Sequence, residues 1–327
     1  QGILVYKNNE IAARAIAIIN QDLNRKMGKA IGLLGYIEFI EDSIALKLLL
    51  ETCSNWLERK GCTLVWTDAR FSLNYQVGIQ NEGFDRSHTF LMPRQPSYYC
   101  KTLENLGFKC IKDLHAYGIK LNPQYVIPTD ITSQANSLLE QEFKVRTMRK
   151  ADVWPCLNHY NEHWKNNFAH TPFSQSELDH LNRSMSLFLD TRFCFMVEKD
   201  KQLVGYLFTF PDYNLHLKEW KGKLSILNIF KFLWTYKIKK NVKGLKTAII
   251  GVDNEYAGRK ISSLLNYALL NQALKYSCSH IERSWILEDN TASIKQAKRM
   301  GGQLIKKYGI YEAPLKTMQN FDFRKVS

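Results

Sequence analysis

The feature that most constrains the fold of this chain is an internal repeat. Residues 35–74 align with residues 251–290 at an offset of 216, and Cys62 falls in register with Cys278. A repeat of this length indicates a duplicated structural unit. The length of 327 residues is also that of two domains. We therefore expect two related halves, each with its own core.

Each copy of the repeat has the order strand, loop, helix, strand. The strands are apolar runs at 30–37 and 63–67 in the first copy and at 247–252 and 280–286 in the second. Between them, apolar residues recur three and four positions apart, which is typical of a helix packed on one face. These residues are Ile44, Leu48, Leu49, Cys53 and Trp56 in the first copy and Ile261, Leu264, Leu265, Ala268, Leu269 and Ala273 in the second.

More elements precede the second copy than the first. Pro123, Pro128 and polar residues interrupt the pattern, which indicates a linker at 121–143 between a domain at 1–120 and one at 144–327. The first domain opens only with a hairpin. The second is expected to open with a strand at 144–148, helices at 154–164 and 174–189, and a hairpin at 194–210.

Composition limits the compartment and the partners. Seven cysteines without a close pair argue against a disulfide framework and favour a reducing cytoplasm. No apolar stretch is long enough to span a bilayer. The net charge of +14 favours an anionic partner, such as a nucleotide cofactor, a membrane surface or nucleic acid, unless the basic residues are only a solvated surface.

The order of elements in the second half, with a glycine-containing loop entering a helix, resembles the GNAT superfamily of N-acyltransferases. The resemblance covers residues 144–315 and, less completely, residues 1–120. It implies an α+β (mixed α/β) fold of two GNAT-like domains, each a mostly antiparallel mixed sheet flanked by helices. It also implies acetyl-CoA or another acyl-CoA as co-substrate, an amine acceptor and no metal ion.

In that family the loop holds the pyrophosphate of acyl-CoA through backbone amides at the helix N-terminus, where free N–H groups and the helix dipole attract anions. The matching loop is Ala257–Ser262, in which Lys260 replaces the central glycine. At positive φ this lysine costs on the order of 1 kcal/mol, which the charges of Arg259 and Lys260 would offset. The alternative is a helix end with two solvated basic residues. The implied cofactor site comprises Ile250, Gly251, Val252, Gly258, Arg259, Lys260, Ile261, Ser262 and Asn290.

The equivalent loop of the first copy is acidic and lacks glycine. Glu38, Glu41 and Asp42 precede its helix, where carboxylates stabilise the helix but repel a pyrophosphate. We therefore expect no CoA site in residues 1–120, and a structural or substrate-shaping role for that half.

Acyl transfer to an amine needs a base, an oxyanion donor and often an acid. The resemblance implies a backbone donor at 250–252 and a tyrosine acid at the position of Ala297, for which Tyr308 and Tyr311 are candidate substitutes. The candidate bases are Glu288, Asp289 and Glu282. The alternative is that these carboxylates, with Asn290, cap the following helix. His163 and Trp164 line an acceptor pocket or pack in the core.

One further segment, residues 221–243, is an apolar run between lysines. It is expected to form a helix that packs across the domain junction, or else one that covers a hydrophobic acceptor or touches an anionic membrane.

Two functions remain open from the sequence. One is an acyl-CoA-dependent N-acyltransferase that acts on an unknown amine. The other is a non-catalytic tandem module that binds acyl-CoA, an anionic surface or nucleic acid. Nucleic acid is not the expected partner of the first, whereas peripheral membrane contact is compatible with both.

Overall fold

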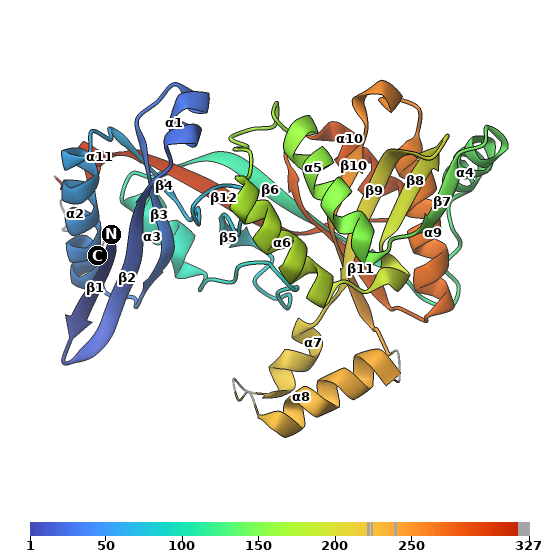
Figure 1. Ribbon diagram of the computed structural model, residues 1–327. Coiled ribbons are helices and arrows are strands. Elements are labelled where there is room, and N and C mark those ends of the chain that lie inside the picture. Colours follow the sequence, from blue (N-terminus) through green and yellow to red (C-terminus); the bar gives the residue numbers. More distant parts are fainter. Residues whose placement is uncertain (221–222, 224, 239–240, 320–327) are drawn as a thin grey trace.

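The strands of both halves form one continuous sheet (Figure 1). The computed structural model describes residues 1–220, 223, 225–238 and 241–319. The strand order is β1-β2-β3-β4-β12-β6-β11-β10-β9-β8-β7, and β5 pairs with β12 beside this path. The strands are β1 (Gly2–Lys7), β2 (Glu10–Ile19), β3 (Ile31–Phe39), β4 (Leu64–Thr67), β5 (Ile79–Glu82), β6 (Lys109–Lys120), β7 (Lys144–Thr147), β8 (Phe195–Lys199), β9 (Gln202–Pro211), β10 (Gly244–Val252), β11 (His280–Leu287) and β12 (Gln303–Pro314).

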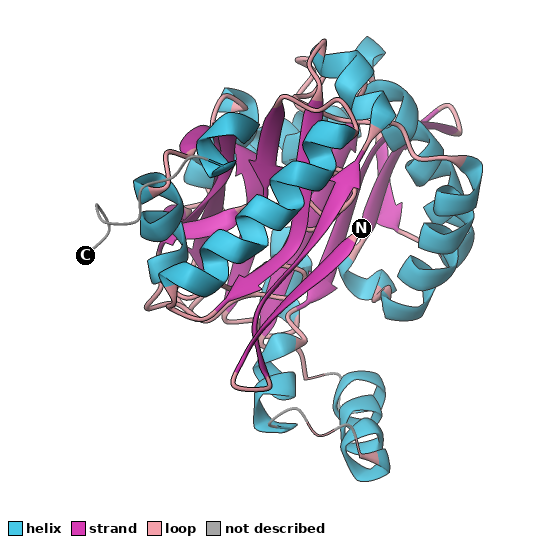
Figure 2. Cartoon of the chain, turned by 90° about the vertical axis from the view of Figure 1, so that its left-hand side faces the viewer, coloured by secondary structure: helices cyan, strands magenta, loops and turns pink. Residues whose placement is uncertain are grey.

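Helices pack on the sheet in both halves (Figure 2). The α-helices are α1 (Gln21–Met27), α2 (Ser43–Arg59), α3 (Tyr98–Asn105), α4 (Thr129–Glu140), α5 (Val153–His163), α6 (Gln175–Phe188), α7 (Asn214–Leu217), α8 (Ile226–Leu233), α9 (Ile261–Lys275), α10 (Thr291–Arg299) and α11 (Leu315–Gln319).

The predicted repeat and the predicted fold class are both confirmed. The units β3-α2-β4 and β10-α9-β11 have the same order, and in each the two strands pair in parallel while the other strand pairs of the described chain are antiparallel. Cys62 and Cys278, which share a register, are both buried. All seven cysteines are free.

Local chemistry explains where several elements begin and turn. Asp42 caps α2 by accepting from the amides of Ile44 and Ala45. Ser174 begins α6 with a capping box. The β8–β9 hairpin turns through Asp200 and Lys201, both at positive φ, as a two-residue hairpin turn requires.

The last long strand of each half is exchanged with the other half. Strand β6 lies between β12 and β11, so Ile119 of the first half pairs with Ile281 of the second. Strand β12 lies between β6 and β4, so Tyr311 pairs with Thr67. The core around α2 therefore contains Tyr311, and the core around α9 contains Ile119. Each core is completed by the other half of the chain.

The segment expected to be a linker contains a packed helix. Helix α4 lies against α9, and its Ile131, Ala135 and Leu138 are buried in the core of the second half. Phe143, at the end of this segment, is also buried there. Proline and polar residues thus delimit a helix here, and its apolar face is what attaches the segment to the second half.

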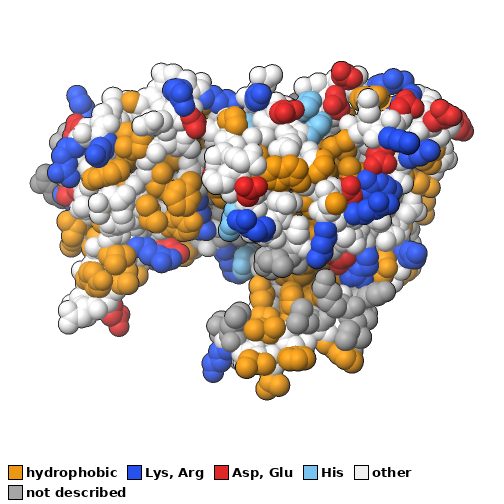
Figure 3. Space-filling view, viewed as in Figure 1, with side chains coloured by type: hydrophobic (Ala, Val, Ile, Leu, Met, Phe, Trp, Pro, Cys, Tyr) orange, Lys and Arg blue, Asp and Glu red, His pale blue; other side chains and the backbone are white. Residues whose placement is uncertain are grey.

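Residues between β9 and β10 project from the body of the molecule as α7 and α8 (Figures 1 and 2). Hydrophobic side chains gather on this projection in Figure 3. The expected helix over 221–243 is thus shorter, from Ile226 to Leu233, and a π-helical turn, Trp234–Ile238, follows it. Figures 1 and 2 show α8 projecting from the body, in place of the predicted packing across the junction between the halves. Residues 221–222, 224 and 239–240 of that prediction lie outside the described residues.

Candidate active site

A cleft opens between β10 and β11, where the two parallel strands part. Their pairing runs from Gly244 with His280 to Thr247 with Arg283 and ends there. A bulge between Thr247 and Ile249 bends β10, which increases the local twist. The resulting cleft has a volume of about 460 Å³. From Gly244 to Thr247 the two strands pair within one sheet. After Thr247 they separate and form the two walls of the cleft.

The N-terminus of α9 faces this cleft. Gly258 and Lys260 both have positive φ, 79° and 63°, so the strain anticipated at Lys260 is present. Lys260 precedes the helix without a side-chain cap. No hydrogen bond among the described residues uses the amides of Ile261 or Ser262. A Cβ built at Gly258 would meet nothing within 4 Å. Free amides therefore stand in front of open space, which suits an anion.

Most of the other residues expected to hold the cofactor line the cleft, whereas Gly251 packs on a neighbouring ring. Ile250, Val252 and Asn290 line the cleft, and Asn290 also caps α10 by accepting from the amide of Ser293. The Tyr206 ring packs directly on the backbone of Gly251. A Cβ at this position would lie 2.3 Å from Cζ of that ring, so only glycine fits there. Ser262 lines the cleft, and its Oγ accepts from Gln296.

Arg259 points elsewhere. Its guanidinium donates to Gln141 Oε1 at 3.3 Å and lies over the Phe143 ring, at the end of the α4 segment. It is absent from the cleft lining, whereas Lys260 is part of it. The structure thus brings only one of the two expected basic side chains to the cleft.

The equivalent opening in the first copy is filled by the chain itself. A Cβ at Gly35 would lie 3.0 Å from the carbonyl oxygen of Ala69. Asp68, which is buried, accepts from the amide of Tyr36 at 2.9 Å. Burial raises the pKa of Asp68 to about 7, although Arg70 acts in the opposite direction. These contacts occupy the place in the first copy that corresponds to the cleft of the second.

None of the three carboxylates expected as bases lines the cleft. Glu282 is buried on the far side of β11, 2.8 Å from Lys306 Nζ. Asp289 pairs with Lys112 at 2.6 Å, which holds the pKa of Asp289 below its usual value. Glu288 accepts from the amide of Asp113. Alternation along β11 turns Glu282 away from the cleft side that Arg283 faces, and Lys112 draws the other two carboxylates to β6.

The tyrosines suggested as acids are also outside it. Tyr308 is buried against Gly78, and the Tyr311 hydroxyl donates to Glu104. Ala297, at the position of the family's acid, is buried and offers no proton.

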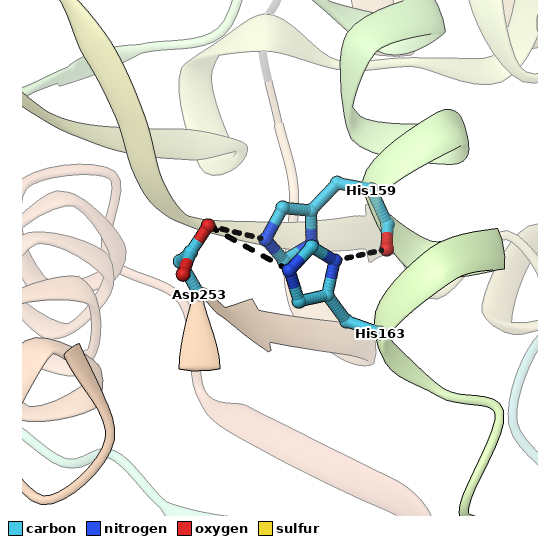
Figure 4. A group of neighbouring side chains, drawn as sticks. All are labelled: His159, His163 and Asp253. Atoms are coloured by element: carbon cyan, nitrogen blue, oxygen red, sulfur yellow. Dashed lines mark hydrogen bonds and ion pairs between the residues drawn. The ribbon is translucent and has the colours of Figure 1, made fainter. Parts of the chain in front are cut away.

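Two histidines and an aspartate stand at the edge of the cleft instead (Figure 4). His159 and His163 stack on α5 with ring centroids 3.8 Å apart and planes inclined by 6°. Their Nε2 atoms lie 3.6 and 3.7 Å from Oδ2 of Asp253, which follows β10 directly. His163 and Trp164, which the sequence suggested for an acceptor pocket or for the core, both line the cleft.

The hydrogen bonds around His163 define its tautomer. Its Nδ1–H donates to the His159 carbonyl at 3.0 Å, so the neutral ring has its lone pair on Nε2, which faces the Asp253 carboxylate. A proton taken up at Nε2 is then stabilised by that carboxylate. His159 is 8% exposed, and burial, followed by the charge of His163, lowers its pKa. His163, unlike His159, also lines the cleft, so it is the ring of the pair that a ligand can reach.

The same three residues could be taken for metal ligands, since their donor atoms lie within 4.8 Å of one another. Nearly parallel rings, however, direct their lone pairs side by side, whereas a metal bound to both rings needs lone pairs that converge. The arrangement suits proton transfer better than metal binding.

Arg283 places a buried cation in the cleft wall. The residue is 4% exposed, and the only hydrogen bond of its side chain among the described residues goes to Met300 Sδ at 3.5 Å. No carboxylate of the described chain pairs with it, and burial lowers its pKa to about 10, so it stays charged at neutral pH. A buried charge without a partner is costly, and a ligand oxygen would supply the missing partner.

His159, Asp253 and Arg283 are not among the residues predicted from the sequence. His159 and His163 are four residues apart and so share a helix face, a spacing that could have drawn attention to the pair. Nothing local distinguishes Arg283 from a surface arginine, because its burial depends on its place in the cleft wall beside Met300, which only the fold brings there.

Comparison with known proteins shows what the second half is similar to. Residues 155–301 match the model of the Acetyltransferase (GNAT) family. A bacterial ceramide synthase of Caulobacter vibrioides is 27% identical over 296 residues, which cover 88% of this chain and 76% of that protein. Protein YghO of Escherichia coli is 25% identical over an alignment that covers 95% of this chain and 81% of that protein.

Solved structures share the fold. A tandem GNAT protein from the clavulanic acid biosynthesis pathway superposes with a TM-score of 0.53 at 10% identity, covering 96% of this chain and 83% of that chain. A GCN5-related N-acetyltransferase from Sphaerobacter thermophilus gives a TM-score of 0.54 at 12% identity, covering 96% of this chain and 80% of that chain.

Proposed function

Because the second half of the chain contains a GNAT acetyltransferase-family domain, within a GNAT-like fold that covers both halves, we propose that the protein transfers an acyl group from acyl-CoA to an amine. The observation that carries this proposal is the cleft between β10 and β11. It joins an uncapped, open helix N-terminus to a histidine paired with a carboxylate.

The residues present fit acyl-CoA. The free amides at Ile261 and Ser262, with Lys260 beside them, would hold a pyrophosphate. The pantetheine arm would then lie between the parted strands, next to Ile250 and Asn290. When bound, acyl-CoA supplies the activated acyl group.

The protein's own residues would do the remaining work. His163 Nε2 would take the proton that the amine must lose, while Asp253 stabilises the resulting imidazolium. Backbone amides of β10 beyond Thr247, where β11 no longer pairs, are positioned to donate to a developing oxyanion. Leu73 and Asn74 of the first half complete the cleft wall, which supports a substrate-shaping role for that half.

The relative from Caulobacter vibrioides suggests the class of acceptor. A ceramide is an amide between a fatty acyl group and a long-chain amino alcohol, and the similarity to a ceramide synthase extends over 88% of this chain. We therefore propose a long-chain acyl-CoA and a lipid-like primary amine as the substrate pair.

The proposal is tested by charge reversal at two adjacent lysine and arginine positions. Lys260→Glu is expected to weaken acyl-CoA binding about tenfold, because it places a negative charge beside the phosphate site. Arg259→Glu is the matched control, since its side chain lies against Gln141 and Phe143, and it should change affinity by less than about threefold.

Affinities would be measured by calorimetry with acetyl-CoA and palmitoyl-CoA, and turnover by thiol release with a panel of short- and long-chain primary amines. Absence of binding by both thioesters would eliminate the enzyme and favour a non-catalytic module. Equal effects of the two substitutions would contradict the placement of the pyrophosphate.

A further inference from the structure

The projection formed by α7 and α8 is attached to the body by one face only. Phe232 and Tyr236 pack on Tyr213, with ring centroids 5.3 and 5.0 Å away, and Phe232 also meets Trp220. Tyr213 and Tyr236 are buried. This aromatic cluster holds α8 in place by its inner face.

The outer face of α8 is apolar and exposed. Ile226, Leu227, Phe230 and Trp234 are 77, 81, 71 and 53% exposed, and their spacing places them together on the side opposite Phe232. Surfaces of this kind that are not covered within the protein are typical of interaction sites. The projection therefore carries a hydrophobic surface that its own fold does not use.

The positive charge of residues 214–243 indicates which kind of surface they bind. Residues 214–243 contain eight lysines and one glutamate, a net charge of +7 in a chain whose total is +14. A second copy of this surface would bring two strongly basic segments together, which is unfavourable. An anionic lipid surface complements both the lysines and the apolar side chains, because basic amphipathic helices lie at the boundary between headgroups and acyl chains.

We propose that α8 docks this protein on an anionic lipid bilayer, with Leu227 and Phe230 inserted among the lipids and the neighbouring lysines on the headgroups. No helix in the described part of the chain has the length and hydropathy to cross a bilayer. The docking is accordingly peripheral.

A second element orients the molecule. Figures 1 and 2 both place the turn of the β1–β2 hairpin on the side of the molecule toward which α8 projects. Tyr6 and Ile11, beside that turn, are 60 and 54% exposed. Two apolar projections on one side define a plane for the bilayer. Resting on the proposed function, this plane is also where a lipid-like amine would be collected.

The test is flotation of the full chain with phosphatidylcholine vesicles, with and without phosphatidylglycerol and at rising salt, in the absence of acyl-CoA and amine. Wild type is expected to float with the phosphatidylglycerol vesicles and to be released by salt. Leu227→Ser with Phe230→Ser should lower the bound fraction at least about tenfold. Lys218→Ala with Lys223→Ala should lower it at low salt, since both side chains are exposed.

The matched control is Leu48→Ser with Leu139→Ser. These leucines are 52 and 42% exposed on α2 and α4, which Figure 1 shows away from α8, so this variant should float like wild type. Wild type that does not float, or an equal loss in both serine variants, would overturn the proposal. A wild-type dimer that the Leu227 and Phe230 changes convert to monomer, without vesicle binding, would do so as well. Because no substrate is present, failure of the acyl-transfer proposal leaves these outcomes unaffected.

Discussion

At the scale of one residue, Arg283 marks a ligand site because its buried charge has no carboxylate partner in the described chain. We expect Arg283→Met to stabilise the folded protein by about 1–4 kcal/mol, because it replaces a buried, unpaired charge with an apolar side chain of similar size. The same change should raise the KM for acyl-CoA. Urea unfolding and steady-state kinetics would measure the two effects.

Arg146 is the contrasting arginine. It donates to both Asp152 and Glu198, so Arg146→Met should destabilise the protein by about 1 kcal/mol or more by leaving two carboxylates without their partner. Loss of stability in both variants would mean that Arg283 is paired in solution.

His163 carries the second prediction at this scale. His163→Gln should lower kcat by about two orders of magnitude and leave acyl-CoA affinity unchanged, since the imidazole is assigned to proton transfer and not to the phosphate site. His180→Gln, an exposed histidine on α6, is the control and should match wild type. Comparable kcat values for both variants would remove His163 from the mechanism.

At the scale of elements, the two copies of the strand–helix–strand unit differ in the space between their parallel strands and the helix N-terminus. The second is open because its strands part in front of free amides, whereas the first is filled by the chain at Asp68. Asp42, an acidic N-cap, occupies the helix end of the first copy, while Lys260 leaves that of the second uncapped. These two differences close the helix end of the first copy and leave that of the second open.

The filled opening predicts a pH dependence of stability. In the folded protein the pKa of Asp68 is about 7, above the ordinary value of 3.8, so between these values the folded state holds a proton that the unfolded chain has released. The contribution of the Asp68 carboxyl to the free energy of unfolding is therefore fully present below about pH 4 and is lost as the pH rises through about 7. Asp68→Asn should remove this slope and make the variant more stable than wild type at pH 8, by on the order of 1–4 kcal/mol. Parallel urea-unfolding profiles for the two proteins across this range would contradict the assignment.

At the scale of the whole molecule, exchange of β6 and β12 makes the two halves depend on each other. Tyr311, Ala313 and Leu315 are buried in the first core, and Ile119 and Leu121 in the second. We expect residues 1–143 and 144–327, expressed separately, to remain unfolded, and co-expression to restore the fold, because each core lacks a strand without its partner. Far-UV circular dichroism and urea unfolding would report this. A cooperative transition in either fragment alone would show that the exchange is not required for folding.

The sequence by itself determined the repeat, the order of elements and the position of the loop that enters α9, because these follow from short-range apolar periods and turn residues. It also predicted that the first copy is unsuited to a phosphate, since the acidic residues before α2 are local in the sequence.

The tertiary structure alone decided which side chains meet in the cleft. Glu282, Glu288 and Asp289 are next to the cleft in sequence, yet each is drawn away by a lysine or an amide on a distant strand. His163 and Asp253 are 90 residues apart in sequence and meet only because α5 packs beside the end of β10. Strand exchange is likewise invisible to a local pattern, because β6 and β12 satisfy the same hydrogen bonds with either half, and only packing of the complete chain selects between them.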